Sequence, residues 1–363
     1  MDVDRNISHA VQGSVLALVL YDVCEEIRLE DVRALLSAER QRPAVKHPAA
    51  DQVRIENPPI IEYLEAIESG GDKFDTQVKY YDYGVVSVLF QRSFAGDWRQ
   101  LVNVAANWIS GSQFEDLGRK VAEDRLRHIR SAVVKPYQEW LAEDYFVFVV
   151  TSVDGSPAAS DLIASHREEI VQIVRGESAQ LSTSEQAEVV QSSISYYPSD
   201  VAVIGWNAAF VYDTPAGSAT AVQLLEYANS QLLDFRHYDE FLTRELGVAR
   251  GLVERGTGIL ARWRLARAAS RLQAVALDVT ALAERVDNAI KFLSDMFSAR
   301  LYRLAATKVG VPDYKRLVDQ KLATARELYS FMIEQFHQGR AFVLELIVVI
   351  ILVIELVYLF RGK

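Results

Sequence analysis

The sequence predicts an α+β protein with an N-terminal mixed or antiparallel sheet, long coiled-coil-like helices after it, and a single C-terminal transmembrane helix. Up to residue 215, short β-rich runs alternate with helical segments. From residue 216, apolar residues recur at alternating steps of four and three, the spacing of a coiled-coil seam. Residues 341–360 are apolar apart from two glutamates, and a helix of this length can cross a hydrocarbon core of about 30 Å. We therefore divide the chain into a head domain (1–215), a helical hairpin and stalk (216–340) and a tail anchor (341–360).

In the head, strands are expected at 14–21, in two runs within 76–90, at 145–151 and at 201–212. Helices are expected at 29–38, 97–109, 114–134 and 162–174. Gly84 can supply a turn or bulge within 76–90, and Asp97 is a candidate N-cap. The order β-α-β-β-α-β is compatible with a split βαβ, ferredoxin-like sheet that carries extra helices.

The helical part contains three seams, at 221–253, 261–296 and 318–336, and Gly310 precedes the third. Asp239 is the only polar member of the first seam. A carboxylate on an apolar seam must be paired or solvated, and Arg236 or His237 of another copy could pair with it. The cluster of Arg236, His237 and Asp239 therefore favours specification of register or oligomeric state over catalysis.

A basic face is expected on the second of these helices, where Arg264, Arg267 and Arg271 lie on one side, next to Trp263. This face is either solvated or paired with the acidic head. Alternatively it contacts an anionic partner, either lipid headgroups or ribosomal RNA.

The tail contains Glu345 and Glu355, which lie on neighbouring lines of one helical face because three plus seven positions separate them. Ionised side chains in lipid are costly. Either these glutamates are protonated or reach the headgroups, or they meet a partner helix in an oligomer. Gly339 is the weakest point of the preceding helix, so we expect a tilt or break there, or else a bend in the second long helix.

Three segments resemble the required-for-meiotic-nuclear-division family: Leu344-Glu345-Leu346-Ile347 with Ile354-Glu355, Tyr83-Gly84-Val85-Val86, and residues 233–239. Leu346 departs from this family, which has Trp there. The resemblance implies a bacterial-type member related to a mitochondrial inner-membrane protein. That protein forms a large homo-oligomer and supports translation by holding ribosomes near the membrane.

The charge distribution and the motifs of the sequence argue against the common enzyme classes. Residues 1–215 carry 33 acidic and 19 basic side chains, so the head does not favour a broad nucleic-acid surface. We find no phosphate loop, dinucleotide fingerprint, nucleophile elbow or zinc motif. The single cysteine, Cys24, suits a small buried side chain. We expect no enzymatic activity, no cofactor, no metal and no small-molecule substrate.

The sequence thus predicts a tail-anchored scaffold that forms homo-oligomers and contacts itself, membrane lipids and the ribosome. We expect it at the bacterial inner membrane with its head in the cytoplasm; the alternative is the mitochondrial inner membrane. The rival functional class is a membrane-attached α+β domain that binds a ligand or acts as an enzyme.

Overall fold

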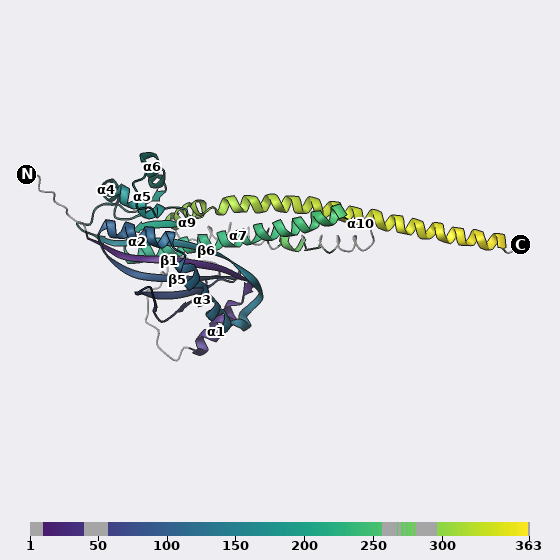
Figure 1. Cartoon of the computed structure of the whole chain (residues 1–363), viewed down its shortest axis with the longest axis horizontal. Coiled ribbons are helices and arrows are strands. Elements are labelled where there is room, and N and C mark those ends of the chain that lie inside the picture. Colours follow the sequence, from purple (N-terminus) through teal and green to yellow (C-terminus); the bar gives the residue numbers. More distant parts are fainter. Residues whose placement is uncertain are drawn as a thin grey trace, which may run out of the picture. The chain divides into compact units, whose positions relative to one another are not determined.

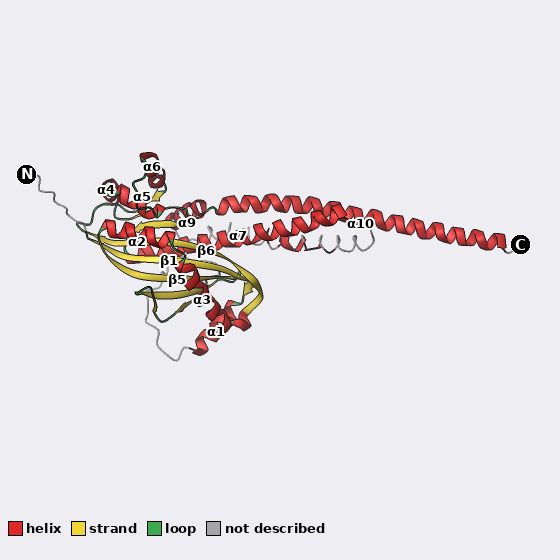
Figure 2. Ribbon diagram, viewed as in Figure 1, coloured by secondary structure: helices red, strands yellow, loops and turns green. Residues whose placement is uncertain are grey.

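The computed structural model describes residues 10–39, 57–255 and 296–361, with short stretches between 267 and 280. The chain forms two compact units. The first comprises Met1–His237 with Val286–Asp313, and the second comprises Tyr238–Arg285 with Tyr314–Lys363. The first unit contains the sheet, and the described part of the second is helical (Figures 1 and 2).

The sheet has nine strands: β1 (Val11–Ile27), β2 (Ile60–Tyr63), β3 (Ile67–Ser69), β4 (Asp72–Tyr80), β5 (Val85–Gly96), β6 (Val133–Val153), β7 (Ser193–Ile194), β8 (Val201–Ile204) and β9 (Ala208–Tyr212). Their order is β2-β4-β5-β1-β6-β9-β8-β7, and β3 pairs with β4. β6 and β9 run parallel, whereas the other described pairs are antiparallel. The predicted α+β class with a mixed sheet is confirmed.

Six described helices precede α7 in the first unit: α1 (Leu29–Glu39), α2 (Trp98–Ser110), α3 (Gln113–His128), α4 (Ala159–Ser165), α5 (Arg167–Arg175) and α6 (Thr183–Gln191). The chain order β1, α1, β4, β5, α2 with α3, and β6 follows the β-α-β-β-α-β pattern. The four strands lie in the order β4-β5-β1-β6, and each neighbouring pair is antiparallel. This is a split βαβ arrangement, extended by β9, β8 and β7 beyond β6.

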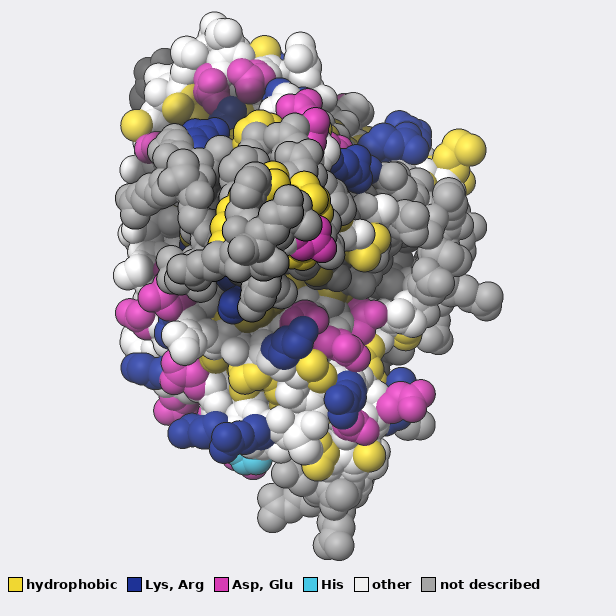
Figure 3. All heavy atoms as spheres, turned by 90° about the vertical axis from the view of Figure 1, so that its right-hand side faces the viewer, with side chains coloured by type: hydrophobic (Ala, Val, Ile, Leu, Met, Phe, Trp, Pro, Cys, Tyr) yellow, Lys and Arg dark blue, Asp and Glu magenta, His cyan; other side chains and the backbone are white. Residues whose placement is uncertain are grey.

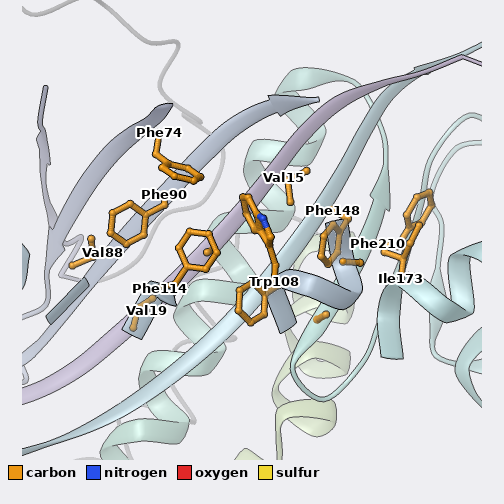
Figure 4. Close-up of a cluster of buried hydrophobic side chains, with 14 of the residues drawn as sticks. Val15, Val19, Phe74, Val88, Phe90, Trp108, Phe114, Phe148, Ile173 and Phe210 are labelled. Carbon is orange, nitrogen blue, oxygen red and sulfur yellow. The ribbon is translucent and has the colours of Figure 1, made fainter. Parts of the chain in front are cut away.

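One face of the sheet packs against α2, α3 and α5 through a large apolar core (Figure 4). Aromatic rings dominate it, and the ring centroid of Phe114 lies 5.6 Å from that of Phe74 and 4.6 Å from that of Trp108. α2 begins with a capping box, in which the Asp97 carboxylate accepts from the Gln100 amide N–H and the Gln100 side chain accepts from the Asp97 N–H. The predicted N-cap is confirmed.

The opposite face is also buried, as Leu16, Leu18 and Leu20 show by their alternation with the core residues of β1. Two helices of the first unit cover it. One is α7 (Pro215–Arg255), of which the part up to His237 belongs to this unit, and the other is α9 (Met296–Val309). Because helices cover both faces, β1 is a nearly continuous apolar run.

Gly84 allows β1 and β5 to approach closely. Its φ is +85°, and a Cβ atom there would lie 1.8 Å from the carbonyl oxygen of Cys24. The Gly84 carbonyl instead accepts from the Val23 N–H at 3.0 Å. Only glycine fits this position without a shift of the backbone.

Several predicted boundaries change. The expected strand at 145–151 is the end of the 21-residue strand β6, and the expected strand at 201–212 is the hairpin β8–β9, divided at Gly205. The helix expected at 162–174 is divided into α4 and α5 at His166.

In the second unit, α7 continues from Tyr238 and α10 (Val311–Arg361) enters at Tyr314. Seam residues here are buried as their spacing predicts: Leu242, Ala249, Val275, Val279, Val318, Leu322 and Ala325. Most of the predicted second helix lies outside the described residues. A bend in it therefore stays a prediction.

The predicted transmembrane helix at 341–360 is wrong. Among the residues that the structure describes, no helix is both long and apolar enough to cross a membrane. α10 continues as a helix to Arg361. α10 also passes through Gly339 as one helix, without the break expected there.

Candidate functional site

The predicted cluster of Arg236, His237 and Asp239 is not a single site. The Arg236 guanidinium pairs with Glu143 of β6, whereas His237 Nδ1 lies 2.5 Å from Asp22 Oδ2 of β1. Successive helical residues point in different directions, and Asp239 instead pairs with Lys321 of α10 at 2.5 Å in the second unit. Because Asp239 has this partner in its own chain, it does not require Arg236 or His237 of another copy.

The pairs formed by Arg236 and His237 hold α7 against the sheet. These two residues are the last of α7 that belong to the first unit. Burial raises the pKa of Asp22, while its hydrogen bond to His237 opposes that shift. Burial likewise raises the pKa of Glu143, and the charge of Arg236 opposes it. The His237 ring also stacks on Tyr137, with the centroids 4.6 Å apart and the planes at 17°. Both carboxylates thus depend on their cationic partners.

A buried polar row on α7 was not predicted. Glu226 is fully buried and pairs with the ammonium of Lys79 on β4. One turn later, the hydroxyls of Ser230 and Tyr83 are hydrogen-bonded at 2.6 Å. Burial raises the pKa of Tyr83 well above its usual range, so this phenol stays protonated. In the sequence, the one signal of a buried ion pair was Lys79, which lies between Val78 and Tyr80 at the apolar end of β4.

Residues 12–219 match the model of a family described as "Uncharacterized protein MJ0711, N-terminal domain". The chain belongs to this family. No curated protein and no solved structure matches the chain. The comparisons do not confirm the resemblance to the required-for-meiotic-nuclear-division family or the relation to its mitochondrial member.

The family match ends at residue 219, within the first turns of α7. The four polar contacts between α7 and the sheet each join a residue inside the match to a residue beyond it: Lys79 to Glu226, Tyr83 to Ser230, Glu143 to Arg236, and Asp22 to His237. The family domain is therefore completed on its second face by a polar row of α7 that follows the matched segment.

Cys24, the single cysteine, is fully buried in the apolar core of the first unit. Burial raises the pKa of its thiol to about 12, and the thiol donates to the Glu26 carbonyl at 3.2 Å. A protonated, enclosed thiol is a poor nucleophile. Within the described residues, no group of three or more acidic, histidine or cysteine side chains could hold a metal ion.

Of the predicted basic face, Arg267 and Arg271 are exposed, and Arg264 lies outside the described residues. The structure shows no contact between this face and a partner, so its role stays a prediction.

The end of α10 is the most exposed apolar element of the described chain. The eleven residues from Ile347 to Val357 are all exposed, and Glu355 is the one polar residue among them. The apolar side chains retain between 47% and 57% of their accessible surface. Figure 3 shows one face of the molecule, on which hydrophobic side chains lie among charged ones. The side chain of Glu345 lies outside the described residues.

Proposed function

We propose that this protein is a homo-oligomeric scaffold, assembled through the exposed end of α10. The observation that carries the proposal is the run from Ile347 to Val357, in which apolar side chains are exposed on every side of the helix. Exposed apolar runs of this kind mark interaction surfaces. A helix that is apolar on every side is normally buried by other elements that pack around it.

A second copy of the same helix is the partner that fits best. Several identical helices, packed around one another, bury all sides of each, whereas one flat partner surface would leave most of each helix exposed. Glu355 lies within this run, and a polar side chain inside a helix bundle can specify register and copy number.

The resemblance to the required-for-meiotic-nuclear-division family also supports an oligomer, because its mitochondrial member assembles in this way. On that resemblance we further propose the ribosome as a client. The predicted location at an inner membrane depended on the transmembrane helix, so we do not carry it forward.

The test is the molar mass of the full chain by size-exclusion chromatography with light scattering. One chain weighs 40.8 kDa. We expect a multiple of this mass for the wild type and a lower mass for Ile350→Glu with Ile354→Glu, which places two charges on one side of the run. Gln320→Glu with Thr324→Glu, two exposed positions of α10 at the same spacing, is the matched control. A wild type of single-chain mass would overturn the proposal, as would a double variant of unchanged mass.

A further inference from the structure

A groove of about 520 Å³ lies on the second face of the sheet, beside the first turns of α7. Strands β1, β4, β5 and β6 form one wall, α7 forms another, and the segment from Pro58 to Tyr63 closes a third side. Small-molecule sites typically measure about 300–1,000 Å³. The groove is therefore large enough for a small molecule, and it belongs entirely to the first unit.

The one charge in the described lining of the groove is balanced by a buried partner. Among the described residues that line it, Lys79 is the only charged one. Its ammonium pairs with Glu226, which is fully buried behind the groove. This neutrality is unusual in a head with 33 acidic and 19 basic residues. A charged ligand would lose its hydration without gaining an unpaired countercharge, so the groove favours an uncharged one.

Side-chain amides are the main polar groups of the groove. Gln77 and Gln91 come from the sheet and Gln223 from α7, and Gln91 is tied to the hydroxyl of Ser14 at 3.2 Å. An amide presents a donor and an acceptor side by side, so it can pair with a planar edge that carries both. Leu89, Val149 and the neighbouring prolines supply apolar surface for the faces of such a ligand.

Two buried polar atoms near Lys79 lack hydrogen-bond partners among the described residues. They are Glu226 Oε1 and Ser87 Oγ. Ser87 is the cross-strand partner of Lys79 on β5, and both residues are more than nine-tenths buried. Buried polar atoms are rarely left unpaired. Glu226 and Ser87 both flank Lys79, which lines the groove, although neither of them lines it.

We propose that this groove binds an uncharged small molecule with flat apolar faces and an edge of mixed donors and acceptors, the chemistry of a nucleoside. The glutamine amides read the edge, the apolar side chains cover the faces, and the Lys79–Glu226 pair closes the inner end. This site is separate from the oligomeric contact proposed for α10 and goes beyond the scaffold function.

The experiment is equilibrium dialysis of the full chain against adenosine, guanosine, cytidine and uridine, with AMP as the anionic counterpart. We expect at least one nucleoside to bind with a dissociation constant below about 1 mM, and adenosine to bind more tightly than AMP. Gln77→Leu with Gln91→Leu should weaken nucleoside binding about tenfold or more, because each lost amide pair removes a specific contact. Gln138→Leu, an exposed glutamine of β6 outside the groove, should bind as the wild type does.

Because the two glutamine substitutions lie in the sheet, a second variant tests the groove without changing a sheet residue. Ala219 is an exposed lining residue on α7, and Ala219→Trp should fill the groove while Gln77 and Gln91 of the sheet are unchanged. We expect it to abolish nucleoside binding while the circular dichroism spectrum stays unchanged. The proposal is overturned if none of the four nucleosides binds, if AMP binds as tightly as adenosine, or if the groove variants bind as well as Gln138→Leu does.

Discussion

The pair of Lys79 and Glu226 joins the family domain to α7 at a fully buried carboxylate. The lost hydration of each buried charge is offset by its attraction to the opposite charge. If one charge is removed, the other stays buried without hydration and without a partner. A sequence pattern cannot reveal this pair. The two residues are 147 positions apart, and Glu226 lies between seam residues of α7, where a charge normally faces water.

We therefore predict that Glu226→Ala destabilises the first unit by about 3–5 kcal/mol, since it leaves the Lys79 ammonium buried and unpaired. The double variant Lys79→Met with Glu226→Leu should restore most of that loss. Urea unfolding followed by tryptophan fluorescence measures both. If the double variant is less stable than Glu226→Ala, the pair is not the reason for the loss.

The carboxyls of Asp22 and Glu143 give the fold a dependence on pH. Burial raises both pKa values above the ordinary 3.8 and 4.5, although His237 and Arg236 oppose the shift. A carboxyl with a raised pKa binds its proton more tightly in the folded state. It therefore stabilises the fold at low pH, and this contribution is lost as the pH rises through the raised pKa.

The corresponding prediction concerns the difference in unfolding free energy between the wild type and Asp22→Asn. This difference should fall as the pH rises from about 4 to about 6. Glu143→Gln should behave in the same way, and Asp161→Asn, an exposed position of α4, should show no such trend. Denaturant titrations across this range provide the measurement. A difference that grows with pH would contradict the assignment.

At the scale of elements, the sequence predicted those strands and helices whose local pattern agrees with their tertiary surroundings. The β-α-β-β-α-β core and the capping box at Asp97 are of this kind. The first part of β6 was missed because residues 133–144 mix charged and apolar side chains and include Pro136, a pattern that local propensity does not favour in a strand. The polar row of α7 was missed because only the tertiary contacts show that it is buried.

The apolar seam of the second unit gives a prediction at this scale. Val279 is 1% exposed on that seam, whereas the next residue, Thr280, is exposed. Val279→Asp buries a carboxylate and should lower the free energy of unfolding by about 3 kcal/mol or more, whereas Thr280→Asp should change it by about 0.5 kcal/mol or less. Thermal melts followed by circular dichroism at the helix band compare the two. Equal melting temperatures would show that this seam is not packed.

For the whole molecule, the apolar end of α10 shows where pattern reasoning failed. Hydropathy along 341–360 predicted a membrane span, which the described helices do not support. A contact between copies in this segment, one of the two alternatives for Glu345 and Glu355, stays a prediction. Residues 347–357 remain exposed in a single chain, and burial by further copies is the central claim of the proposed function.

The most direct test of that claim is disulfide crosslinking of the full chain through Val353→Cys, in the middle of the exposed run. The native Cys24 does not interfere because it is fully buried. The account predicts covalent dimers on a non-reducing gel after mild oxidation of Val353→Cys at low protein concentration. It predicts none for Thr324→Cys, an exposed control position on α10. Absence of a dimer at position 353, or equal dimer formation at position 324, would contradict it.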